Sequence, residues 1–173
     1  MSMTRFGLLF PEVAERETRT AKVFEALPAA DPRHLPVDEY GFDELYCDQR
    51  GCDCRRVMIN VLARHARQHV ATINHAFQKP TKDDLVAEQT FLDPLNRQSP
   101  WAAALLDLFI NQILADEAYR QRLVLHYRMF KNVVEDPAHP APRLVHLPEV
   151  GAAGSRGRSI PPPPRKGKRK RWR

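Results

Sequence analysis

The pattern of hydrophobic and polar positions is clearest between residues 99 and 135, where it has the period of an α-helix. A Ser99-Pro100 pair is typical of a helix start, and apolar side chains recur at helical spacing over residues 105–114. A second stripe follows Asp116 and ends before the Asp136-Pro137 pair. Its members are Tyr119, Leu123, Tyr127, Phe130 and Val134. The pattern therefore predicts a helix over about 100–114 and a second between Asp116 and Asp136, packed as a hairpin or a bent unit.

The preceding part of the chain has the residue content of β-strands. Arg56–Leu62 and His69–Phe77 are rich in β-branched residues and are separated by a short polar loop, which predicts a hairpin. Phe42–Cys47 is predicted as a strand joined to it by a turn, and Thr18–Phe24 as a further strand. The fold class expected is α+β, a three- to four-stranded antiparallel meander packed against the two-helix unit.

The expected register of the hairpin follows from matching apolar residues. Val57 opposite Ile73 and Ile59 opposite Ala71 would place these side chains on one buried face of the sheet. In this register His69 and His75 also lie on that face.

Charge divides the chain into two regions. The net charge is +6, yet residues 151–173 hold nine of the 27 basic residues and no acid, so residues 1–150 carry 18 − 21 = −3. The last region also contains four consecutive prolines and too little apolar surface to fold. We therefore expect a single α+β domain over residues 1–150 and a disordered Pro/Arg/Lys-rich tail over 151–173.

The tail ends in a basic run followed by an aromatic residue. Such a run attracts phosphate backbones, and a tryptophan can stack on an unpaired base. The residues are Arg165, Lys166, Lys168, Arg169, Lys170, Arg171 and Trp172. Nucleic-acid binding through this tail is one hypothesis. A solvated charge cluster without a partner, or GC-rich DNA translated out of its ancestral frame, would give the same composition.

Three cysteines form the only group with candidate chemistry. Cys47, Cys52 and Cys54 have C-x4-C-x-C spacing around Gly51, so that a tight turn could bring three sulfurs to one Zn²⁺ ion at about 2.3 Å. Three reduced thiols without a metal are the alternative. A zinc-stabilised binding module and a thiol- or zinc-dependent enzyme are both hypotheses for this group, but no recognised catalytic motif frames it.

The candidate fourth ligand is His126, on the inward side of the second helix, with Asp48 or Asp53 as alternatives. His65 lies about 11 residues from Cys54, roughly 30 Å along an extended strand, and is out of reach. His69 and His75 are disfavoured because the expected register places them on the face away from Cys52 and Cys54.

No apolar stretch approaches the roughly 18 residues that indicate a membrane span, and the N-terminal apolar run is too short for a signal peptide. We therefore expect a cytoplasmic protein with reduced cysteines and no membrane partner. A protein partner of unknown identity is a further expectation.

Three segments resemble an uncharacterised bacterial protein family. They are ELYCDQRGCDCRRVMINV (44–61), QTFLDPLNRQSPWAAALLDLF (89–109) and LHYRMFK (125–131). Many members of this family carry a C-terminal SEC-C zinc-binding motif, which is absent here. The resemblance implies that Cys47, Cys52 and Cys54 act as a unit and adds weight to His126, but it implies no reaction.

Overall fold

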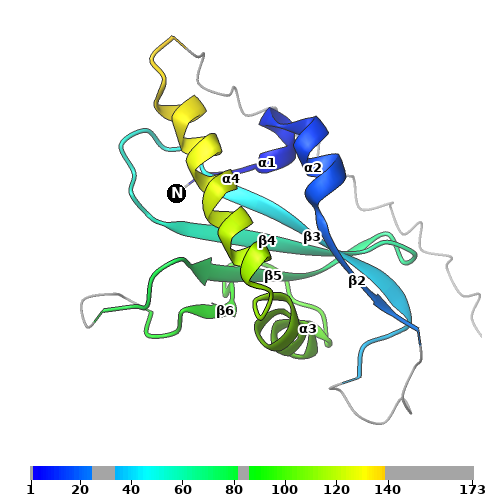
Figure 1. Ribbon diagram of the computed structural model, residues 1–173. Coiled ribbons are helices and arrows are strands. Elements are labelled where there is room, and N and C mark those ends of the chain that lie inside the picture. Colours follow the sequence, from blue (N-terminus) through cyan, green and yellow to red (C-terminus); the bar gives the residue numbers. More distant parts are fainter. Residues whose placement is uncertain (1, 25–33, 82–85, 139–173) are drawn as a thin grey trace, which may run out of the picture. The chain divides into compact units, whose positions relative to one another are not determined.

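An antiparallel sheet forms the centre of the computed structural model, which describes residues 2–24, 34–81 and 86–138 (Figure 1). Within these residues the strands are β1 (Met3–Arg5), β2 (Arg19–Val23), β3 (Asp38–Cys47), β4 (Arg56–Ala63), β5 (Gln68–Ala76) and β6 (Thr90–Leu92). The strand order is β1-β3-β4-β5-β6, and β2 also pairs with β3. Because β1 pairs with the end of β3 and β2 with its beginning, the two share one edge of that strand.

Four α-helices and one π-helix lie within the described residues. They are α1 (Phe6–Leu9), α2 (Pro11–Glu17), α3 (Ala102–Leu108), which continues into the π-helix η1 (Phe109–Ile113), and α4 (Glu117–Glu135). Asp116 caps α4 as expected, since its carboxylate accepts a hydrogen bond from the Tyr119 N–H at 3.3 Å. Phe109 and Ile113, the first and last residues of η1, both point into the core, where they are 0% and 3% exposed.

The expected α+β class is confirmed, but the sheet is larger than predicted. The four predicted strands correspond to β2, β3, β4 and β5, and the two-helix unit corresponds to α3-η1 and α4. The short elements β1, β6, α1 and α2 were not predicted, because three- to seven-residue segments show too few periods of any pattern. The described residues belong to one compact unit, Met1–Arg143, so the predicted boundary near residue 150 lies outside them.

The predicted hairpin register was wrong by two residues. Val57 lies opposite His75, Ile59 opposite Ile73 and Val61 opposite Ala71. A shift of two keeps every side chain on its predicted face, because side chains alternate with period two. The buried face is therefore as expected.

The core fills the space between this face and the helices. Val57, Ile59, Val61, Ala71 and Ile73 are all fully buried. In Figure 1, α4 crosses the strands on this face. The helix side chains buried in the same cluster include Leu105, Phe109, Ile113, Leu123 and Phe130. Tyr127 and Phe77, also expected in the core, are only partly buried against it.

Candidate metal centre

The three cysteines meet where β3 ends and the following loop begins. Cys47 is the last residue of β3 and is buried, while Cys52 and Cys54 lie half-buried in the loop that leads to β4. Their sulfur atoms all lie within 4.8 Å of one another. Tetrahedral zinc with bonds of about 2.3 Å holds its sulfurs about 3.8 Å apart. Only small side-chain movements would therefore bring all three sulfurs onto one ion.

Arg50 ties this loop to the end of α4. Its Nε donates a hydrogen bond to the Val134 carbonyl at 3.0 Å, and its Nη2 donates to the Asp136 carbonyl at 3.3 Å. The last carbonyls of a helix have no partner within the helix. Arg50 therefore completes the C-terminus of α4 and holds the cysteine loop against it.

Two further contacts fix the same loop. The Gly51 N–H donates to the Glu135 carboxylate at 2.9 Å, and Lys131 Nζ donates to the Gln49 carbonyl at 3.1 Å. Gly51 has φ of 72°, a conformation that glycine adopts without steric cost. Protein contacts alone therefore preorganise the turn between Cys47 and Cys52. No sequence pattern indicates Arg50, Lys131 and Glu135 in this role, because no local spacing relates residues more than 80 positions apart.

The thiols are held close together in a partly buried environment. Burial raises the pKa of Cys47, and burial together with the neighbouring Cys47 and Cys52 raises the pKa of Cys54 to about 12. Three thiols at such distances disfavour one another's ionised forms. A divalent cation has the opposite effect, because it binds thiolates and releases their protons. This donor set therefore fits a soft or borderline metal such as zinc.

The two aspartates considered as fourth ligands have other partners. Asp48 accepts hydrogen bonds from the hydroxyls of Ser2 and Thr4 at 3.1 and 2.7 Å. Asp53 pairs with Arg55 at 2.8 Å. Among the described residues, no histidine, carboxylate or further cysteine joins the three cysteines as a fourth ligand.

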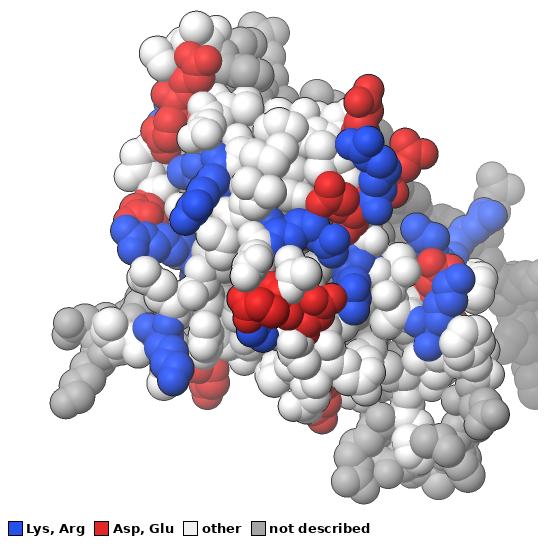
Figure 2. Space-filling model, in the orientation of Figure 1, with Lys and Arg blue, Asp and Glu red and all other residues white. Residues whose placement is uncertain are grey.

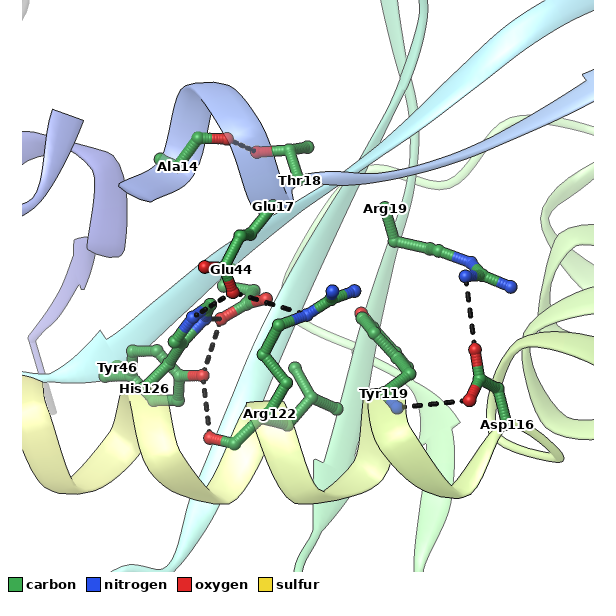
Figure 3. Close-up of polar contacts among 11 residues, drawn as sticks. Ala14, Glu17, Thr18, Arg19, Glu44, Tyr46, Asp116, Tyr119, Arg122 and His126 are labelled. Carbon is green, nitrogen blue, oxygen red and sulfur yellow. Dashed lines mark hydrogen bonds and ion pairs between the residues drawn. The ribbon is translucent and has the colours of Figure 1, made fainter. Parts of the chain in front are cut away.

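His126 lies in a separate buried network (Figure 3). Its Nδ1 is 2.8 Å from Glu44 Oε2, and its Nε2 is 3.2 Å from Glu17 Oε2. The Tyr46 hydroxyl donates to the same Glu44 oxygen at 2.7 Å, and the Phe6 ring stacks on the imidazole at 4.2 Å between centroids. Both ring nitrogens thus face carboxylates, and the structure does not bring His126 to the sulfurs. The network connects α2, β3 and α4.

The other three histidines considered also have their own contacts. His65 lies in the turn after β4, and its Nδ1 is 3.3 Å from a carboxylate oxygen of Asp38. His75 Nδ1 is 2.8 Å from the Thr90 hydroxyl. The expected face of His69 was wrong. A β-bulge at Val61/Leu62 places it opposite Leu62, and its Nε2 is 2.9 Å from the Thr72 hydroxyl.

The basic run, Arg165–Trp172, lies outside the described residues, so nucleic-acid binding through the tail stays a prediction. On the face in Figure 2, basic and acidic side chains are interspersed. No helix in the described part of the chain is both long and apolar enough to cross a bilayer.

Comparison with known proteins adds no relative. No protein-family model, no curated protein and no solved structure matches this chain. The resemblance of residues 44–61, 89–109 and 125–131 to the family with SEC-C members therefore stays a prediction.

Proposed function

We propose that this chain is a small zinc-stabilised binding module in which Cys47, Cys52 and Cys54 hold one Zn²⁺ ion. The observation that supports the proposal is the mutual distance of at most 4.8 Å between the three sulfurs, on a loop that α4 already fixes. Preorganisation lowers the entropic cost of binding, because little of the loop has to be ordered when the metal arrives.

The metal has a structural role in this proposal. It joins the end of β3 to the loop before β4, and its binding free energy adds to the stability of the folded state. The fourth position of the tetrahedron is filled by water or by an added ligand. A thiol nucleophile is less well supported, since such a residue needs a lowered pKa and a base. The pKa values of Cys47 and Cys54 are raised, and no histidine of the described residues joins the group.

Elemental analysis of the purified full chain tests the proposal. We expect about one zinc per chain, lost in the Cys52→Ser/Cys54→Ser double variant, together with a lower melting temperature when a chelator removes the metal. Asp53→Asn is the matched control, because Asp53 lies between the two cysteines yet pairs with Arg55. This control should keep its zinc. Metal-free protein whose melting temperature does not change on adding zinc would refute the proposal.

A further inference from the structure

The cysteine group supplies three of the four ligands that a closed zinc site takes. Structural zinc sites are tetrahedral, and their protein ligands are four cysteines, three cysteines and one histidine, or two of each. All three cysteines of the sequence already belong to the group, so this sequence offers no fourth thiolate. A structural site on this loop therefore closes with a histidine.

Elimination leaves two histidines for that position. The sequence contains seven, and five of them lie in the described residues. These five are His34, His65, His69, His75 and His126. None of the five joins the sulfur group in the part of the chain that the structure describes. The other two, His139 and His146, follow Ala138, the last described residue.

The chain enters this last segment next to the cysteine loop. The Glu135 carboxylate accepts a hydrogen bond from the Gly51 N–H at 2.9 Å, and Gly51 directly precedes Cys52. The Asp136 carbonyl accepts from Arg50 Nη2 at 3.3 Å. Figure 1 shows the C-terminal end of α4 beside the loop between β3 and β4. The residues that follow α4 therefore start beside the three sulfurs.

Chain length allows His139 to reach the sulfurs. Through the contact between Glu135 and Gly51, bond lengths alone place the Glu135 backbone at most about 16 Å from the Cys52 sulfur. His139 follows Glu135 by four residues, and four extended residues with an imidazole side chain span roughly 17 Å. Pro140 disfavours a helical backbone at the residue before it, which favours such an extended chain.

We propose that His139 is the fourth ligand of the zinc ion, so that the metal ties the segment after α4 to the end of β3. His146 follows Glu135 by eleven residues instead of four. Because the effective concentration of a tethered group falls with about the −3/2 power of the tether length, His139 is favoured roughly fivefold. The inference rests on the proposed function, since it names a further ligand of the same ion.

X-ray absorption at the zinc edge, measured on the zinc-loaded full chain, tests this ligand set. We expect three sulfurs at about 2.3 Å and one nitrogen at about 2.0 Å, with the outer-shell scattering of an imidazole ring. His139→Ala should replace the imidazole by a water oxygen and weaken zinc binding at least tenfold in competition with a chelator, because even the loss of an outer-shell partner costs about 10–100-fold. Added imidazole should restore part of the lost affinity, since it can occupy the same position. His146→Ala is the matched control, because it removes the same side chain seven residues further along, and it should change neither the spectrum nor the affinity.

Zinc-loaded protein whose spectrum shows an oxygen in place of the imidazole would overturn this inference and leave the three-cysteine site standing. Loss of the imidazole signal in His146→Ala, with His139→Ala unchanged, would overturn it as well. Sedimentation of the same samples covers a second copy, since a zinc-dependent dimer would give the fourth position to a neighbouring chain and contradict a ligand from the same chain. Protein that takes up no zinc refutes the proposed function, and this inference with it.

Discussion

Replacing His126 with leucine tests how much the buried network contributes to stability. The His126 side chain is 2% exposed and that of Glu44 is 5% exposed, and their ring nitrogen and carboxylate oxygen lie 2.8 Å apart. Leucine has nearly the volume to fill the site and to contact Phe6, but it cannot donate to Glu44. The variant therefore leaves a buried carboxylate with the Tyr46 hydroxyl as its remaining donor.

The expected loss follows from the hydrogen-bond donor that the Glu44 carboxyl group loses. Leaving a buried acceptor without one of its donors costs about 1–3 kcal/mol. A domain has about 5–15 kcal/mol of stability in total, so His126→Leu should remove a large part of it. The contact with Glu17 adds little, because that side chain is 36% exposed and water screens its charge.

Urea titration measures the effect as a fall in the unfolding midpoint, of about 1 M for a typical slope. Glu17→Gln is the control and should cost no more than about 1 kcal/mol. The Glu44→Leu/His126→Leu double variant should regain much of the loss, because no buried carboxyl group is then left without its donor, and the Tyr46 hydroxyl can donate its proton to the Leu123 carbonyl, 3.1 Å away. A loss below about 1 kcal/mol for His126→Leu, or a double variant less stable than the single one, would contradict this account of the network.

Three further predictions concern other parts of the domain. Burial lowers the pKa of His75 from 6.5 to about 4, so the unfolded chain binds a proton at a higher pH than the folded chain does. The free energy of unfolding should therefore fall by roughly 3 kcal/mol between pH 7 and 4, and His75→Gln should flatten this fall in urea titrations. An unchanged slope would refute this. Ile59→Asp should lower the melting temperature sharply, since Ile59 is 0% exposed, whereas Asn60→Asp on the opposite face should have little effect. Arg50→Ala should cost about 1–2 kcal/mol and weaken zinc binding, because the cysteine loop loses its bonds to α4; unchanged zinc affinity would show that the loop needs no anchor.

The sequence by itself determined the features that depend on local patterns. The helical period after Asp116, the alternation along residues 56–62 and the Asp136-Pro137 break predicted α4 and β4 close to their observed bounds. The period-two alternation also determined which side chains of β4 face the core, and this held although the register was two residues off. The cysteine group was predictable for the same reason, since only four residues separate Cys47 from Cys52 and one turn brings them together.

Only the tertiary structure decided which partners distant residues find. His126 was predicted to face inward, and it does, but its contact is Glu44, 82 positions away, and not the cysteines. The bulge that turns His69 to the other face and the bonds from Arg50 to α4 have no local signal either. Periodicity fixes which side of a strand or helix is buried. Which residues then meet across that buried side depends on strand register, bulges and the packing of whole elements, and these are set by the sum of many weak contacts.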